Sequence, residues 1–115
     1  MSPEQQQIAI AKACGWTGTE EDYTYYGFTQ NIPMTRTRWT NPSGGQTTLT
    51  LPDYLNDLNA CHEMEKVLDY NQLREMEDSV SFQFAVYPFH ATASQRAEAF
   101  LRTLGLWKEN PTQPQ

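Results

Sequence analysis

The sequence lacks the long apolar run that a membrane-spanning helix would need, and it is poor in cysteine and in basic residues. A spanning helix takes about 20 consecutive apolar residues, and no stretch of this chain approaches that length. The opening Met-Ser-Pro-Glu-Gln has neither the basic nor the apolar region of a signal peptide, so none is expected. We therefore predict a cytoplasmic protein with no membrane partner.

Cysteine is represented by Cys14 and Cys61, far from the Cys-x-x-Cys spacing of redox and zinc sites. Two such residues do not make a disulfide framework, so both are expected to be reduced. The string His62-Glu63-Met64-Glu65-Lys66 has a lysine where a zinc protease needs its second histidine. The chain also lacks the GxGxxG, GK[ST] and GxSxG motifs of phosphate cradles and serine nucleophiles. These absences predict no metal, no cofactor and no enzymatic activity.

Positive charge is scarce as well, because 8 lysines and arginines face 14 acidic residues, for a net charge of −6. Affinity for duplex nucleic acid depends on clustered basic side chains that release counterions from the phosphate backbone, and here they are scattered. Binding to duplex nucleic acid is therefore excluded. The acidity fits an ordinary solvated surface, or a DNA mimic that docks a nucleic-acid enzyme of a host.

What the chain does contain predicts an α+β fold. Residues 1–109 are expected to form a single domain and the tail 110–115 to be mobile. The predicted architecture is a helix–sheet–helix sandwich, in which three helices pack a mainly antiparallel sheet of three to four strands, in the order α-β-β-(β)-α-β-α. The expected helices span residues 3–14, 53–69 and a third segment from a cap at Thr92 or Ser94 to Gly105. The expected strands span residues 23–29, 35–40, 47–51 and 79–87, with an acidic turn at 20–22, a breaker at 31–33 and a helical turn plus loop at 70–78.

Two local patterns support these assignments. Ser2, Pro3 and Gln5 form the start of a capped helix, and Gly15 can adopt the left-handed conformation that ends it. In the run 79–87 one face carries Val80, Phe82, Phe84 and Val86 and the other carries Ala85 and Tyr87, which predicts a strand covered at least partly on both faces. The core is expected to contain seven residues: Leu58, Phe82, Phe84, Val86, Phe100, Leu101 and Leu104.

One segment could bind an anion. Residues 90–96 place hydroxyls, backbone N–H groups and an arginine at the expected start of the third helix, where the helix dipole favours negative charge. The candidate ligand-binding residues there are His90, Thr92, Ser94, Gln95 and Arg96. The alternatives are simple capping by Thr92 or Ser94, and an Arg96 that pairs with a carboxylate such as Asp57 or extends into water.

A second candidate lies on the expected strands. Arg36 and Arg38 alternate on one face, with Tyr23 and Tyr25 available on the neighbouring strand. Guanidinium and aromatic groups together could grip a nucleotide or a protein partner. An ordinary exposed sheet face is the alternative interpretation.

Four stretches together resemble the small proteins of the phage ABA-sandwich domain family. They are Leu51–Ala60, His90–Ala99, Cys14-Gly15-Trp16 and Leu104-Gly105-Leu106-Trp107. The resemblance implies a helix–sheet–helix sandwich encoded by a bacteriophage or prophage. It brings no activity and no catalytic or binding residues with it.

The functional hypothesis is therefore a non-enzymatic phage accessory protein acting in the host cytoplasm. One form of it binds and sequesters an anionic small molecule such as a nucleotide immune signal, using the start of the third helix. The alternative is an acidic interaction protein, of inhibitor or DNA-mimic type, that docks a host protein. The oligomeric state stays open, a homo-oligomer included.

Overall fold

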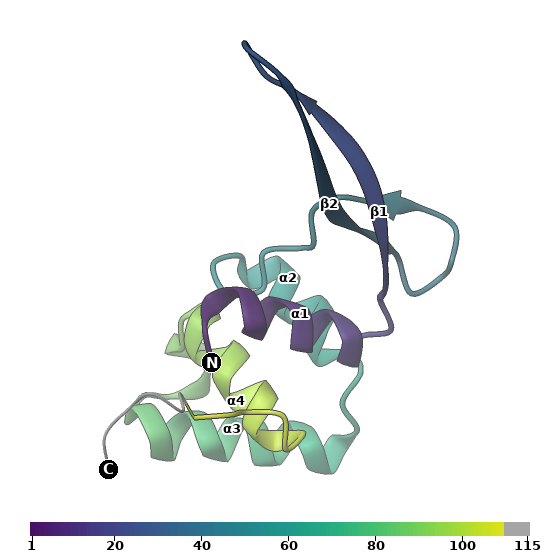
Figure 1. Cartoon of the computed structure of the whole chain (residues 1–115). Helices are drawn as coiled ribbons and strands as arrows, with labels where there is room; N and C mark the ends of the chain where they lie inside the picture. The colour runs from purple at the N-terminus through teal and green to yellow at the C-terminus, as the bar shows by residue number, and fades with distance from the viewer. Residues whose placement is uncertain (110–115) are drawn as a thin grey trace. The chain divides into compact units, whose positions relative to one another are not determined.

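The computed structural model describes residues 1–109, which form four α-helices, a short 3-10 helix and a three-stranded antiparallel sheet (Figure 1). The α+β class is thus as predicted, and the order along the chain is roughly helix, sheet, helix. The chain divides into two compact units, a helical unit of Met1–Cys14 with the chain from Pro52 onward, and a sheet unit of Gly15–Leu51. The single domain over residues 1–109 stays a prediction, and the predicted mobile tail lies outside the described residues.

The helical unit is organised around its last helix. Its elements are α1 (Pro3–Ala13), α2 (Leu58–Glu65), α3 (Tyr70–Phe84), the 3-10 helix η1 (Pro88–His90) and α4 (Ala93–Thr103). Helix α4 packs against α1, α2 and α3 (Figure 1). Large side chains from all four helices are fully buried: Ile10, Met64, Met76, Val80, Phe100 and Leu101. None of the helices in this part of the chain is both long and apolar enough to cross a bilayer.

Two predicted helix starts are confirmed in atomic detail. The Ser2 hydroxyl accepts from the Gln5 backbone N–H at 3.1 Å, while the Gln5 side chain accepts from the Ser2 backbone N–H at 2.9 Å. Thr92 and Gln95 form the same reciprocal pair at the start of α4. Such capping boxes satisfy backbone donors that a helix start leaves without intrahelical partners. Gly15 follows α1 with a φ of +98°, as predicted.

The predicted strand at residues 79–87 is wrong, because residues 79–84 belong to α3. Asp69 accepts from the Gln72 backbone N–H at 2.8 Å and starts a helix of 15 residues. Met76 and Val80, four residues apart, are buried on one face of that helix, whereas Phe82 is 92% exposed. A helix satisfies its backbone hydrogen bonds internally and needs no neighbouring strand. A short alternating run does not by itself distinguish a strand from a helix, so this sequence is compatible with both.

The predicted helix over residues 53–69 is also wrong in its extent. A turn holds residues 54–56, and α2 begins after Asp57, whose carboxylate accepts from the Asn59 N–H at 2.9 Å. Leu58, at the first helical position, is therefore 47% exposed instead of belonging to the core. Of the other predicted core residues, Phe100 and Leu101 are buried, Phe82 is exposed, and three are half-buried: Phe84, Val86 and Leu104.

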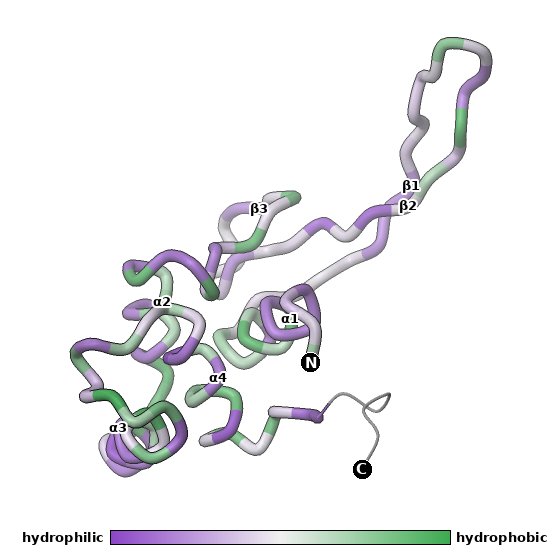
Figure 2. The backbone as a smooth tube through the Cα atoms, turned by 90° about the vertical axis from the view of Figure 1, so that its left-hand side faces the viewer, coloured by the Kyte–Doolittle hydropathy of each residue, from purple (hydrophilic) through white to green (hydrophobic). Residues whose placement is uncertain are grey.

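The sheet unit is a long hairpin with a short third strand (Figures 1 and 2). Strand β1 (Thr17–Tyr26) pairs antiparallel with β2 (Asn31–Thr40), and β3 (Thr47–Thr48) pairs with the end of β2. The predicted acidic turn at 20–22 lies within β1, and the predicted breaker at 31–33 lies within β2. Proline is accommodated at Pro33 because β3 pairs with β2 at residues 39–40 alone, so the rest of β2 is an edge.

The base of the hairpin requires a close approach between its strands. Trp39 on β2 is 7% exposed and lies opposite Gly18 on β1. A Cβ atom at Gly18 would come within 2.9 Å of the Trp39 ring and of the Thr37 methyl group. The absence of a side chain at Gly18 therefore lets the indole lie across the hairpin.

Candidate functional site

The start of α4 holds the predicted anion-binding residues, but its arginine is already paired. Arg96 Nε donates to Glu65 Oε1 at 2.5 Å, and Arg96 Nη1 donates to the carbonyl oxygen of Pro88 at 2.7 Å. The side chains of Arg96 and Glu65 are 13% and 12% exposed. Glu65 raises the pKa of Arg96 through this hydrogen bond, against a smaller effect of burial. The carboxylate partner is thus Glu65 of α2, not Asp57.

The other predicted residues of this segment also have internal roles or lie on the surface. Thr92 and Gln95 use their side chains in the capping box of α4. Ser94 is exposed, and the exposed His90 ring lies 4.4 Å from the Phe89 ring. The segment is consequently a capped helix start whose positive charge is neutralised by the fold.

Arg36 and Arg38 belong to the other unit and share a single carboxylate. Arg36 Nε donates to Glu21 Oε1 at 2.8 Å, and Arg38 donates to both Glu21 oxygens at 2.9 and 3.0 Å. Hydrogen bonds from Arg38 first, and then from Arg36, lower the pKa of Glu21 to about 2. Arg36 also lies over the Tyr23 ring, 4.5 Å from its centroid. The predicted proximity of arginine and tyrosine is present, although Glu21 already occupies both guanidinium groups.

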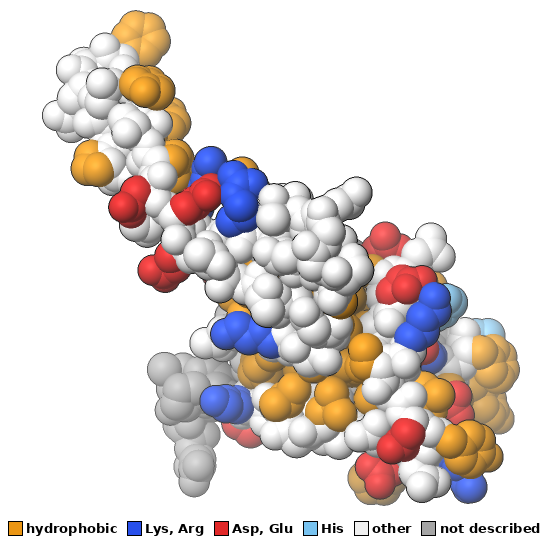
Figure 3. Space-filling view, turned by 90° about the vertical axis from the view of Figure 1, so that its right-hand side faces the viewer, with side chains coloured by type: hydrophobic (Ala, Val, Ile, Leu, Met, Phe, Trp, Pro, Cys, Tyr) orange, Lys and Arg blue, Asp and Glu red, His pale blue; other side chains and the backbone are white. Residues whose placement is uncertain are grey.

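The hairpin carries an apolar face that continues from this cluster. Residues directly opposite on antiparallel strands point to the same side, so the pairs Glu21–Arg36, Tyr23–Met34 and Tyr25–Ile32 share one face. Tyr25, Ile32 and Met34 are 55%, 41% and 42% exposed. Figure 3 shows hydrophobic side chains along this part of the hairpin, beyond the charged groups.

The tip of the hairpin adds two more exposed rings. Tyr26 is 78% exposed, and Phe28 protrudes fully from the turn between the strands. We call these two rings, together with Tyr25, Ile32 and Met34, the hairpin patch; Tyr26, which pairs with Asn31, points to the face opposite Tyr25. Sequence reasoning named Tyr25 of this patch and missed the other four residues, although for Phe28 an aromatic residue next to Gly27 in a turn was a usable signal.

The two cysteines are poorly suited to chemistry. Both are free thiols, and Cys61 donates to the Tyr54 carbonyl oxygen at 2.9 Å. Burial raises the pKa of Cys61 to about 11 and also raises the pKa of Cys14. A thiol in this state is a weak nucleophile at neutral pH. Within residues 1–109, no group of three or more His, Cys, Asp or Glu side chains is placed to hold a metal ion.

Comparisons with protein-family models, with curated protein sequences and with solved structures gave no match. The resemblance to the phage ABA-sandwich family therefore stays a prediction.

Proposed function

We propose that this chain is a non-enzymatic interaction protein that docks another protein through the hairpin patch. The carrying observation is the exposure of five large apolar side chains on one hairpin, which spans residues 17–40: Tyr25, Tyr26, Phe28, Ile32 and Met34. Large apolar side chains that gather in solvent on one element typically mark an interaction site. Tyrosine, phenylalanine and methionine are also the residue types enriched in the cores of protein interfaces.

The charged cluster beside the patch suits the border of such an interface. Glu21, Arg36 and Arg38 hold one another in a fixed arrangement through charge-assisted hydrogen bonds, so less side-chain entropy is lost on binding. Polar groups at the border of an apolar contact add specificity more than affinity.

We prefer docking of a protein to sequestration of a nucleotide-like signal at the start of α4. In that segment the cation expected to bind the ligand is buried against Glu65. Within the docking hypothesis the geometry favours an inhibitor over a DNA mimic. A mimic needs a row of unpaired carboxylates, whereas the central acidic residue of the hairpin, Glu21, is shared by two arginines. A phage origin and a target in the host cytoplasm belong to the same proposal.

The test uses a double variant of the tip, Tyr26→Ser/Phe28→Ser, and a matched control, Phe82→Ser. All three residues are highly exposed, so both variants should fold like the unchanged protein. Tagged proteins are expressed in bacteria, and co-purified proteins are quantified by mass spectrometry. A true target is recovered with the unchanged protein and with the control.

The tip variant should bind that target at least about thirtyfold more weakly by calorimetry, because aromatic hot-spot residues contribute about 2 kcal/mol or more. Equal recovery of every bound protein by all three chains would overturn the proposal. So would a target that is lost with Phe82→Ser and retained by the tip variant.

A further inference from the structure

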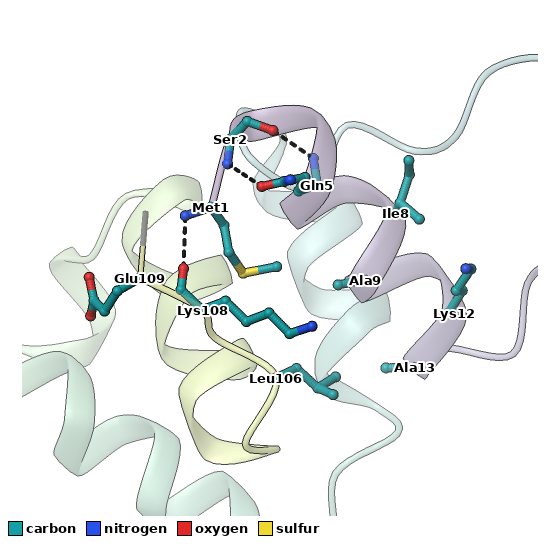
Figure 4. A pocket seen from close by; sticks show the side chains of 10 residues that line it. All are labelled: Met1, Ser2, Gln5, Ile8, Ala9, Lys12, Ala13, Leu106, Lys108 and Glu109. Carbon is teal, nitrogen blue, oxygen red and sulfur yellow. Dashed lines mark hydrogen bonds between the residues drawn. The ribbon is translucent and has the colours of Figure 1, made fainter. Parts of the chain in front are cut away.

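A groove with a volume of about 1130 Å³ lies between α1 and the segment that follows α4 (Figure 4). Ile8, Ala9 and Ala13 line it from α1, and Leu106 lines it from the other side. Leu106 is 37% exposed, so the groove keeps apolar surface in contact with solvent. A concave, mostly apolar surface of this size is typical of a small-molecule site.

The wall opposite α1 is held in place by backbone hydrogen bonds. Gly105, with a φ of +72°, turns the chain back after α4. The N–H groups of Leu106 and Trp107 then both donate to the carbonyl oxygen of Leu101, at 2.8 and 3.2 Å. The nitrogen of Met1 donates to the carbonyl oxygen of Lys108 at 2.9 Å, which links this wall to the start of α1. The groove is thus formed by fixed elements on both sides.

Two lysines belong to the polar part of this groove, Lys12 from α1 and Lys108 from the opposite wall, beside Ser2, Gln5 and Glu109. In Figure 4 the Lys108 side chain extends over the space between α1 and Leu106. Neither ammonium group has an ion-pair partner among the described residues, and the same holds for Arg74 on α3. The other basic side chains are paired with carboxylates: Arg36, Arg38, Lys66, Arg96 and Arg102.

The one carboxylate of the lining is engaged outside the groove. Glu109 lies 3.5 Å from Arg102 and accepts from the Trp107 indole N–H at 3.3 Å. Arg102 in turn lies over the Trp107 ring, 4.9 Å from its centroid. In a chain with a net charge of −6, the groove therefore combines apolar walls with two lysines that have no ion-pair partner within residues 1–109.

We propose that this groove binds an anionic single-chain amphiphile, a free fatty acid of medium length. The alkyl chain would lie on Ile8, Ala9, Ala13 and Leu106, and the carboxylate would lie between the ammonium groups of Lys12 and Lys108. Burial of the methylene groups against the apolar walls supplies most of the affinity. The lysines select for the negative head group. A nucleotide fits less well, because the lining has neither an arginine nor an aromatic ring.

The test titrates the full chain with dodecanoate below its critical micelle concentration, by isothermal calorimetry. We expect one site per chain and no binding of acetate. Lys12→Gln/Lys108→Gln and Ile8→Asn should each weaken dodecanoate at least about tenfold, which corresponds to about 1.4 kcal/mol. The control Arg74→Gln removes the third unpaired cation, which lies on another helix, and should bind as the unchanged protein does. Urea denaturation shows that each variant is folded.

Several outcomes would overturn the proposal. One is the absence of dodecanoate binding, and a second is dodecanoate binding that the groove variants do not weaken. Another is binding to phosphatidylglycerol vesicles without binding of monomeric dodecanoate, which would identify a membrane surface as the ligand. A dimer that Ile8→Asn converts to monomer would assign the groove to a second copy of this chain. The tip variant Tyr26→Ser/Phe28→Ser should retain dodecanoate, so this test stands independently of the proposed docking function.

Discussion

Arg96 lies in the first turn of α4, where a positive charge opposes the helix dipole. Its position is explained by what it connects, because its guanidinium group bonds to Glu65 of α2 and to the carbonyl oxygen of Pro88 in η1. One side chain thereby links three elements of the helical unit. The same contacts that hold the elements together remove this cation from the set available to a ligand.

Replacing Arg96 by alanine should destabilise the protein by about 3–5 kcal/mol, because it leaves the mostly buried Glu65 carboxylate unpaired. Urea denaturation measures the loss. The double variant Arg96→Ala/Glu65→Ala should recover part of it, since no unpaired charge then remains buried. A loss below about 1 kcal/mol for the single variant would place the pair among ordinary surface ion pairs.

At the scale of elements, the parts that sequence predicted best are those with local chemical signals. The caps at Ser2 and Thr92 depend on side chains three residues apart, and both helices begin where predicted. Helix α3 has the same signal at Asp69 and Gln72, but in the sequence Asp69 also lies at the end of the predicted helix over residues 53–69. The alternating run after it then matched a strand, and nothing local opposed that interpretation.

The candidate site on the hairpin was also predictable from the sequence in part. Arg36 and Tyr23 were placed on neighbouring strands, and they are in contact. The sharing of Glu21 between two arginines depends on the strand register, which the sequence does not specify when both faces are largely solvated. Burial of Arg96 depends on which elements pack together, so it could not be read from local patterns.

A pair of phenylalanine substitutions tests the orientation of α3 and α4. Phe100→Ala should cost about 3–5 kcal/mol, because it removes a fully buried ring and leaves a cavity. Phe82→Ala should change stability by less than about 0.5 kcal/mol, because that ring is exposed and alanine favours a helix. Denaturant titration of both variants gives the comparison. Equal, large losses would mean that residue 82 packs in the core, as in the strand predicted from sequence.

For the whole molecule, the buried side chains are distributed unevenly between the two units. Within residues 15–51, Trp39 is the one apolar side chain that is buried, whereas the helical unit buries large side chains from four helices. Buried apolar area is the main source of stability in a folded chain. The helical unit therefore carries most of the folding free energy.

Hydrogen exchange should reveal this difference directly. Amides in β1 and β2 are expected to show protection at least about tenfold lower than amides in the middle of α4, because segments with few buried contacts open locally. Mass spectrometry of peptides from the exchanging protein measures both. Equal protection in the hairpin and in α4 would show that the chain opens as one cooperative unit.

Pro33 has a consequence for how the protein behaves at high concentration. A long two-stranded ribbon presents rows of unsatisfied backbone groups that another ribbon can extend, which is the first step toward fibrils. A proline in β2 deletes one backbone donor from such a row, and the exposed carboxylates of Glu20 and Asp22 make stacked copies repel each other. The hairpin can thus keep an exposed aromatic tip while its strands resist polymerisation.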